Sequence, residues 1–225
     1  MKLLAIDTAS VICAACVYDT VARQEDGRAV LDLGKGHAEH LMAVVGNAMQ
    51  RAKITFPEFD AVAASIGPGS FTGARVGVAA ARGLAMALKV PAIGVTTLEA
   101  LAAEARQRFG GVTVMSALDA GRGEINAAVY GETGATLVEP TVMTLDEAVL
   151  LARRRSTVVV GSAGPRIAVE LPAVKTGSTS ATADIGYYAA IAAGRDAGGE
   201  KPRPLYLRGA DAKPQAGFVL SRQAT

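Results

Sequence analysis

Runs of apolar residues along this chain alternate with short polar turns, in a pattern typical of an α/β protein. Residues 3–7 (LLAID) and 11–18 (VICAACVY) predict two strands around a small turn, and residues 28–34 (RAVLDLG) predict a third. Residues 37–52 place apolar side chains at helical spacing, and Pro57 lies beyond the end of that helix. The chain is therefore predicted to open with three strands and a helix.

The alternation continues through the middle of the chain. Residues 61–70 (AVAASIGPGS) predict a strand that runs into a glycine-rich turn, and the Ala-rich stretch 72–88 predicts a long helix after it. A short strand at 91–95 and a helix from Thr97 to about Arg108 follow.

Two landmarks occur twice, which indicates an internal duplication. A strand ending in Asp, a turn and a second strand ending in Tyr occupy Asp7–Tyr18 and again Asp119–Tyr130, and in both the Tyr follows the Asp by eleven positions. The strand that enters a glycine-rich turn at 61–70 recurs at 157–165 (TVVVGSAGP). The alternative is that strand–turn units in α/β proteins often look alike.

The order of these landmarks predicts an α/β fold of two similar subdomains, residues 1–102 and 103–225. Each subdomain has a mixed sheet and flanking helices, and helices at 145–154 and 184–193 belong to the second. Few apolar residues follow Gly209, so the tail beyond it is expected to fray.

Composition and charge narrow the function classes. Of 225 residues 50% are hydrophobic, and 23 basic against 21 acidic residues give a formal charge of +2. Phosphate contacts supply much of the affinity for nucleic acids, so this balance argues against strong nucleic-acid binding by the chain alone. The basic run at 153–155 is expected to be a solvated helix end rather than an RNA contact. Asp7 interrupts the apolar start and no run reaches the ~18 residues of a membrane span, so we expect a cytoplasmic protein without membrane contact.

The cysteines and histidines do not have the spacing of a metal site. Cys13 and Cys16 lie three apart on a predicted strand and so face opposite sides, as two buried structural thiols. His37 and His40 are the only histidines, with Glu39 between them, and no third ligand is evident. We therefore predict no metal site here and expect an exposed helix start.

The sharpest local motif is GPGSFTG at 67–73. Gly67 and Gly69 give a tight turn its backbone freedom, and Ser70 or Thr72 can cap the following helix. The amides at that helix start favour an anion, so the motif is either a capped tight turn or an anion-binding site. It is not a Walker A motif, because no Gly-Lys-Ser/Thr follows, and its glycine spacing differs from a dinucleotide fingerprint.

Two carboxylates close apolar strands in the two halves, Asp7 and Asp119. In a doubly wound arrangement such strand ends face the central crevice, where two carboxylates could hold hydrated Mg²⁺ against nucleotide phosphates. The alternative is that each Asp ends its strand by bonding the turn backbone. No Ser–His–Asp set accompanies them. The candidate nucleotide site in the crevice contains Asp7, Thr8, Gly67, Gly69, Ser70 and Asp119.

Six segments occur in the order found in a known family. They are LLAIDTAS, the helix start with His37 and Glu39, GPGSFTGARVG at Gly67–Gly77, PAIGVTTLEALA, ALDAGRGEI, and PLYLR at Pro204–Arg208. Together they resemble the TsaB (also called YeaZ) family of the bacterial tRNA threonylcarbamoyladenosine pathway, densely over residues 1 to about 130 and thinly after that. The resemblance implies a duplicated actin/hexokinase-like (ASKHA) fold.

The resemblance also implies a division of labour between subunits. Family members of this kind pair with the larger, paralogous subunit TsaD, which holds the metal and the transferase site, and they work with a small ATPase subunit, TsaE. This chain would be a non-catalytic scaffold or activating subunit with no catalytic residue or metal of its own, and it would meet tRNA through the complex. ATP or ADP would bind at the complex interface. The three-residue spacing of His37 and His40 differs from the H-x-x-x-H motif of TsaD.

By resemblance, the surface that binds TsaD lies on the helices at 37–52 and 72–88. Small side chains let helices approach closely, and the same surface could form a homodimer when the chain is alone. The alternative is that the apolar stripes of these helices pack only onto the chain's own sheet. The interface residues would be Leu41, Val44, Val45, Ala48, Ala74, Val78, Ala81 and Ala85.

The second strand end departs from the family pattern. The family commonly has Asp-Ala-Arg there, whereas Gly121 separates Asp119-Ala120 from Arg122 in this chain, so the guanidinium is displaced by one position.

Two other function classes are open. A stand-alone small-molecule kinase of the same superfamily would need a catalytic Asp in the crevice, for which Asp7 and Asp119 are the candidates. A zinc peptidase rests only on the HAEH pattern at 37–40.

Overall fold

The computed structural model describes residues 1–155, 158–196 and 198–208. The tail beyond residue 209, which the sequence predicts to fray, lies outside these residues. Three strands, a helix, a strand, a helix, a strand and a helix make up the first half, with a short 3-10 turn at Phe56–Glu58. Their bounds are β1 (Lys2–Asp7), β2 (Ile12–Asp19), β3 (Gln24–Asp32), α1 (His37–Ala52), β4 (Ala61–Ser65), α2 (Phe71–Leu88), β5 (Ala92–Val95) and α3 (Thr97–Phe109).

The second half repeats this order of elements. Their bounds are β6 (Val114–Gly121), β7 (Glu124–Tyr130), β8 (Thr136–Met143), α4 (Leu145–Arg155), β9 (Val158–Val160), α5 (Gly164–Glu170), β10 (Lys175–Thr176) and α6 (Ile185–Ala193).

Corresponding strands have the same neighbours in the two sheets. The strand order of the first sheet is β3-β2-β1-β4-β5. Written from the corresponding edge, the order of the second sheet is β8-β7-β6-β9-β10. β1 is antiparallel to β2 and parallel to β4, and β6 pairs in the same way with β7 and β9. The prediction of a duplicated α/β fold with one mixed sheet in each half is therefore confirmed.

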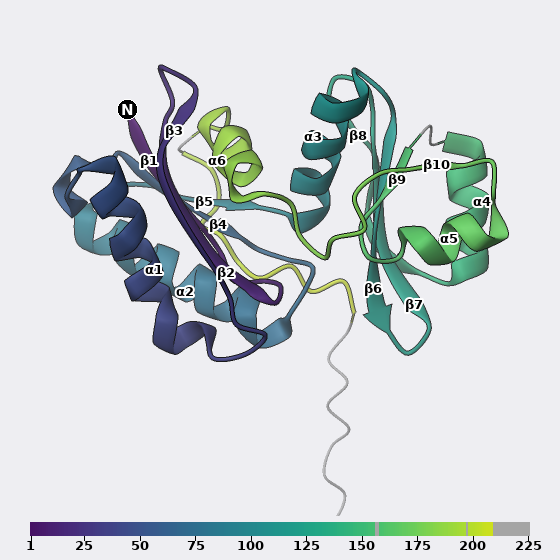
Figure 1. Ribbon diagram of the computed structural model, residues 1–225, viewed down its shortest axis with the longest axis horizontal. Helices are drawn as coiled ribbons and strands as arrows, with labels where there is room; N and C mark the ends of the chain where they lie inside the picture. Colours follow the sequence, from purple (N-terminus) through teal and green to yellow (C-terminus); the bar gives the residue numbers. More distant parts are fainter. Residues whose placement is uncertain (156–157, 197, 209–225) are drawn as a thin grey trace, which may run out of the picture.

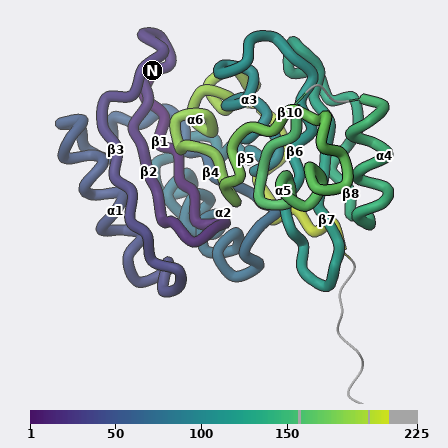
Figure 2. Tube along the Cα trace, turned by 45° about the vertical axis from the view of Figure 1, so that its right-hand side comes forward, coloured from purple at the N-terminus to yellow at the C-terminus, as the bar shows by residue number. Residues whose placement is uncertain are grey.

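The helices and sheets stack in layers (Figure 1). α1 and α2 cover the outer face of the first sheet, and α4 and α5 cover the outer face of the second. α3 and α6 lie between the sheets and share one apolar core with both, around Leu98, Leu101 and Tyr188. Because α6 contacts β1 and β2 of the other half, the two halves complete each other's core (Figure 2).

Side-chain periodicity explains how each element buries a face. α1 buries Leu41, Val44 and Val45 at helical spacing against the first sheet. β2 alternates, with Cys13 in the outer core and Cys16 in the central core, so the predicted pair of buried thiols on opposite faces is confirmed. Burial raises the pKa of the Cys13 thiol to about 11.

β3 begins at Gln24, four residues before the predicted start. It is an edge strand, so its first residues keep polar side chains while their backbone pairs with β2. Gly27 lies where α1 crosses this strand, and an added Cβ would be 2.5 Å from the carbonyl O of Ala48. Because polar side chains and a glycine occupy these first positions, no apolar run marked the start of the strand.

Three further expectations concern the division of the chain, its basic run and a membrane span. The predicted division between residues 102 and 103 falls inside α3 and stays a prediction. The basic residues at 153–155 lie exposed in the last turn of α4. Within the described residues, no helix is long and apolar enough to cross a membrane.

Candidate functional site

Hydrogen bonds at both ends fix the glycine-rich turn between β4 and α2. The Ser70 hydroxyl accepts a hydrogen bond from the N–H of Gly73 at 3.1 Å, so Ser70 rather than Thr72 caps α2. Gly67 has a φ of 88°, which glycine adopts readily, and its carbonyl accepts a hydrogen bond from the N–H of Thr97 at 2.8 Å. The capped-turn interpretation is therefore confirmed.

The same turn packs against the backbone that follows β1. A Cβ on Gly69 would lie 2.0 Å from the carbonyl O of Ala9, and one on Gly73 would lie 1.9 Å from that of Thr8. The Thr8 hydroxyl donates a hydrogen bond to the Gly73 carbonyl at 2.7 Å. Two glycines of the motif thus serve close packing, and Thr8 is buried behind the turn.

Asp7 is fully buried where the two halves meet. Its Oδ2 accepts a hydrogen bond from the Thr182 hydroxyl at 2.6 Å, and its Oδ1 accepts one from the N–H of Ala9 at 2.9 Å. The Thr182 hydroxyl also lies 2.7 Å from the Tyr188 hydroxyl. Burial raises the pKa of the Asp7 carboxyl, and the hydrogen bonds from Thr182 and Ala9 offset part of this rise. Asp7 is consequently enclosed by its own chain.

Asp119 occupies the corresponding strand end, but its side chain is 48% exposed. Its Oδ1 accepts a hydrogen bond from the N–H of Gly121 at 2.7 Å, and its Oδ2 lies 3.3 Å from Arg166 Nη1. Each Asp therefore bonds the backbone two residues ahead, as the strand-end alternative holds. A Mg²⁺–nucleotide site built on both carboxylates does not fit this arrangement, because protein donors occupy both oxygens of Asp7.

The two histidines lie in different surroundings. His37 is buried, with its Nε2 3.1 Å from the carbonyl O of Ile12, whereas His40 is exposed on α1. The expectation of an exposed helix start is thus wrong for His37, whose ring turns toward the start of β2. In the described part of the chain, no three His, Cys, Asp or Glu side chains are arranged so that they could hold a metal ion.

The eight residues predicted for a partner interface lie in the chain's own core. The most exposed of them, Ala74, has an exposed fraction of only 6%. The apolar stripes of α1 and α2 pack onto the first sheet, as the alternative interpretation holds. A partner can therefore reach α1 and α2 only through their other faces.

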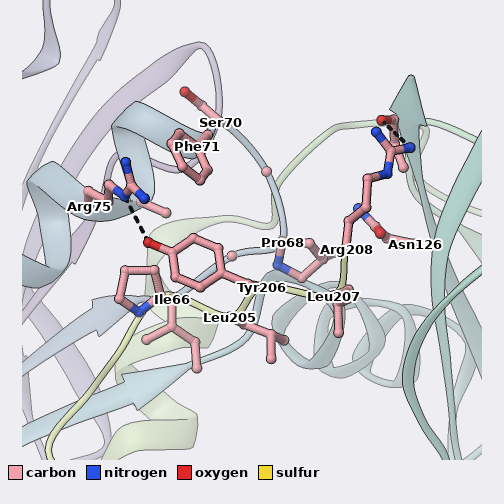
Figure 3. A pocket seen from close by; sticks show the side chains of 15 residues that line it. Ile66, Pro68, Ser70, Phe71, Arg75, Asn126, Leu205, Tyr206, Leu207 and Arg208 are labelled. Atoms are coloured by element: carbon pink, nitrogen blue, oxygen red, sulfur yellow. Dashed lines mark hydrogen bonds between the residues drawn. The ribbon is translucent and has the colours of Figure 1, made fainter. Parts of the chain in front are cut away.

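A pocket of about 800 Å³ lies between the glycine-rich turn and the second sheet (Figure 3). Residues 66–71 with Ala74 and Arg75 line one side, and Ala120 and Asn126 line the other. The C-terminal segment 204–208 runs along it. Of the predicted crevice set, Gly67, Gly69 and Ser70 line this pocket, while Asp7, Thr8 and Asp119 are not among its lining residues.

Three side chains that the sequence did not single out dominate one end of the pocket. The Arg75 guanidinium lies 3.5 Å from the centre of the Phe71 ring, and its Nε donates a hydrogen bond to the Tyr206 hydroxyl at 2.7 Å (Figure 3). The Phe71 and Tyr206 rings are 5.6 Å apart. The available signal was an aromatic residue in each of the motifs GPGSFTGAR and PLYLR.

The segment 204–208 contacts both halves as it passes the pocket. The N–H of Leu205 donates a hydrogen bond to the carbonyl of Ile66 at 2.8 Å. At the other end of the segment, Arg208 forms an ion pair with Glu124, and its Nη2 lies 3.4 Å from the carbonyl O of Gly121. The PLYLR motif therefore ties the turn after β4 to the β6–β7 hairpin.

One family model and two relatives match this chain in sequence. A family model described as TsaD, tRNA N6-adenosine threonylcarbamoyltransferase, matches residues 31–193. The chain is 35% identical to the tRNA threonylcarbamoyladenosine biosynthesis protein TsaB of Escherichia coli over 133 residues, which is 58% of this chain and 55% of that protein. The chain thus matches about half the length of this relative. It is 34% identical to an uncharacterised protein of Mycobacterium tuberculosis over 220 residues, 95% of each.

Solved structures share the architecture at low sequence identity. A Pseudomonas aeruginosa protein described as similar to peptidase YeaZ matches with a TM-score of 0.75 at 23% identity, over 92% of this chain and 99% of that one. An inorganic polyphosphate/ATP-glucomannokinase of Arthrobacter matches with a TM-score of 0.52 at 15% identity, over 85% and 98%. These likenesses show a duplicated actin/hexokinase-like fold.

Proposed function

The chain belongs to the TsaB (YeaZ) family, and from this membership we propose that it is a subunit of the machinery that forms N6-threonylcarbamoyladenosine in tRNA. It acts as a non-catalytic scaffold that pairs with TsaD and activates it. TsaE joins this pair, tRNA is met through the complex, and ATP or ADP binds at the complex interface. The chain works in the cytoplasm.

The enclosed Asp7 supports the non-catalytic role. Phosphoryl transfer relies on positioned groups that reach the phosphate or its metal, and the Asp7 carboxylate is covered on all sides. The same observation speaks against Asp7 as the catalytic carboxylate of a stand-alone kinase, and the other candidate, Asp119, is bonded to the Gly121 backbone and paired with Arg166.

The proposed pairing with TsaD rests on residues that α1 and α2 expose on their outward faces. Met42 and Gly46 of α1 and Gly83 and Met86 of α2 are exposed, Met86 to 80%. A Cβ added to either glycine would meet no atom within 4 Å beyond the nearby backbone of its own helix, so neither glycine serves packing against another part of the chain. Glycine inside a helix costs about 1 kcal/mol relative to alanine. An exposed glycine in each of the two helices therefore favours a neighbour that approaches them closely from outside, and methionine adapts to irregular contacts.

This face is tested by Met86→Asp, with Val169→Asp as the matched control. Val169 is 75% exposed on α5, in the outer layer of the other half. A carboxylate buried without a partner at the contact should weaken binding to TsaD at least tenfold, in line with about 2–5 kcal/mol for an unpaired interface charge. Pull-down and titration calorimetry with purified TsaD measure the effect, and Val169→Asp should bind like the unmodified chain.

Two results would contradict the proposal. One is unchanged TsaD affinity in Met86→Asp. The other is threonylcarbamoyl transfer to tRNA, or ATP-dependent phosphorylation of a small molecule, by the purified chain without TsaD. Light scattering of the isolated chain supplies a further check, since a homodimer through the same face should dissociate in Met86→Asp.

A further inference from the structure

We propose that exposed basic side chains at one end of the second half bind the phosphate backbone of RNA. We name this surface the basic end, and it consists of Arg108, Arg153, Arg154, Arg155 and Lys175. The inference rests on the proposed function and deepens it, since it gives this chain its own contact with the tRNA of the complex.

The register of the second sheet brings these residues to one end of it. Val114, Val158 and Lys175 lie side by side at the starts of β6, β9 and β10. α3 ends at Phe109 and α4 ends at Arg155, each shortly before one of these strands begins. The last turns of both helices therefore flank the strand starts, α3 on the inner face and α4 on the outer, at the upper end of the second half in Figure 1. With strands about 4.8 Å apart and helices about 10 Å wide, the basic end spans on the order of 20 Å.

The five cations of the basic end are exposed and have no acidic partner. Among the residues that the structure describes, none forms an ion pair or a hydrogen bond with any of their charged groups. Acidic residues nearby are Glu132 in the turn between β7 and β8, Glu170 in the last turn of α5, and Glu104 one turn before the end group of α3. With these three counted, this small part of the surface still carries as much net charge as the whole chain, whose formal charge is +2.

Helix stability alone does not account for this arrangement. A basic residue in the last turn of a helix favours the carbonyl end of the helix dipole, and by itself the run at 153–155 would be a solvated helix end. Three consecutive residues, however, point about 100° apart, so they do not all serve the same carbonyls. Lys175 belongs to a strand, and its Nζ lies 4.7 Å from the centre of the Phe109 ring. The Arg108 guanidinium lies 5.5 Å from the same centre, so one ring holds cations from two elements in place.

An RNA backbone fits this surface better than unpaired bases do. Each Lys or Arg that neutralises a phosphate releases a bound counterion, and five exposed cations along one end suit a row of phosphates. The Phe109 ring at this end is half-buried and faces two cations, so it offers no open surface for stacking a base. Contacts to phosphates alone are independent of sequence and are typical of double-helical RNA. The basic end also lies in the other half from the outward face of α1 and α2, so this chain can hold TsaD and RNA together (Figures 1 and 2).

The test measures how tightly the complex of this chain with TsaD binds a fluorescent tRNA transcript, by anisotropy at several salt concentrations. A variant with Arg153→Ala, Arg154→Ala and Arg155→Ala should bind tRNA at least tenfold more weakly at low salt. The slope of the logarithm of affinity against the logarithm of salt concentration should become shallower by about 2, because each lost phosphate contact removes about 0.9. A variant with Arg108→Ala and Lys175→Ala should weaken binding at least threefold.

The matched control removes three positive charges elsewhere. Arg23→Ala, Lys35→Ala and Lys201→Ala change exposed residues outside the basic end, and together they should leave tRNA affinity within twofold. The proposal is overturned if either basic-end variant binds tRNA as tightly as this control does. Binding of the unmodified chain to anionic lipid vesicles or to polyglutamate, lost in the variants while tRNA affinity stays unchanged, would assign the surface to a membrane or an acidic protein and would likewise overturn it.

A failure of this inference can be told from a failure of the proposed function. Titration calorimetry should give the same TsaD affinity for the unmodified chain and all three variants, so a loss of tRNA binding is not a loss of the complex. If the unmodified chain does not bind TsaD, the proposed function fails, and anisotropy with the chain alone at low salt still tests the basic end. Equal tRNA binding by the unmodified chain and the basic-end variants in that assay overturns the inference.

Discussion

The two halves of the molecule share an order of strands and helices but differ in how much chain surrounds each sheet. α1 and α2 have 16 and 18 residues, whereas the corresponding α4 and α5 have 11 and 7. In the glycine-rich turn of the first half, Gly69 and Gly73 both lie against backbone carbonyl oxygens, whereas in the second half Gly161 lies against the Ala117 carbonyl and Gly164 makes only ordinary contacts. The duplication has thus kept the topology while the packing has diverged.

The strand-end carboxylates show the same divergence in chemistry. Asp7 is enclosed and bonded to Thr182, 175 residues further along the chain, while Asp119 faces solvent beside Arg166. One carboxylate holds the two halves together and the other stays at the surface. Equivalent positions in a duplicated fold therefore need not have equivalent roles, and substitutions at paired positions can measure the difference.

The largest difference in the free energy of unfolding is expected between the variants Gly73→Ala and Gly164→Ala. The new Cβ would lie 1.9 Å from the backbone O of Thr8 in the first case and 3.9 Å from the nearest atom in the second, an ordinary contact. Because backbone must move to admit it, Gly73→Ala should lower the free energy of unfolding by about 3 kcal/mol or more. Gly164→Ala should change it by less than about 0.5 kcal/mol. Urea denaturation measures both, and equal losses would contradict the contrast in packing.

The next largest difference in the free energy of unfolding is expected between the variants Asp7→Ala and Asp119→Ala. The first leaves the buried Thr182 hydroxyl and the N–H of Ala9 without their acceptor, and it should lower the free energy of unfolding by about 2–3 kcal/mol. The second removes an exposed ion pair and should cost less than about 0.5 kcal/mol. Chemical denaturation at neutral pH compares the two variants.

Thr182→Val serves as a control for the Asp7 variant, because it removes the hydroxyl donor while nearly keeping the side-chain shape. A loss of about 1–2 kcal/mol is expected there. If Asp7→Ala cost no more than Asp119→Ala, Asp7 would not be the tie between the halves that the geometry indicates.

The smallest expected effect is a pH dependence. Burial raises the folded-state pKa of Asp7 above its ordinary value of 3.8, so the folded protein holds that proton more tightly than the unfolded chain does. The stability that Asp7 contributes is therefore full at pH values below its unfolded pKa and is lost as the pH rises through its folded pKa, at about 1.4 kcal/mol for each unit of difference. Asp7→Asn cannot titrate, so the stability of the unmodified chain relative to this variant should fall as the pH rises from 4 to 8.

Urea denaturation across that pH range measures how the free energy of unfolding changes with pH, with Asp119→Asn as the control variant. A difference between the unmodified chain and Asp7→Asn that grows with pH would show that hydrogen bonds to the ionised carboxylate outweigh its burial.

Much of the fold was predictable, because each strand and helix buries one face and leaves a periodic record. The eleven-position interval between Asp and Tyr identified the duplication for a structural reason. In each half it spans a hairpin, in which Tyr18 lies opposite Leu3 and Tyr130 lies opposite Val114. The polar start of β3 was missed because an edge strand need not be apolar, and local sequence does not say which strand lies at an edge.

The candidate site was only partly predictable, because its decisive contacts join distant parts of the chain. Gly67, Gly69 and Ser70 were found from their local turn chemistry, and they line the pocket. The contact between Arg75 and Tyr206 spans 131 positions, and no local pattern announces it. For the same reason Asp7 was expected in an open crevice. The apolar stripes of α1 and α2 were found correctly, but periodicity cannot show whether a sheet or a partner covers them.

Synthesis on the ribosome delivers α6 after every other described helix, although this helix covers β1 and β2 near the start of the chain. Until residues 185–193 have emerged, the inner face of the first sheet lacks its cover, and the N-terminal half waits with apolar surface open to water. Long-range contacts of this kind slow folding, and exposed sheet faces bind chaperones or aggregate in the interval. A nascent chain stalled before residue 185 should therefore remain protease-sensitive throughout, and not only in its unfinished half.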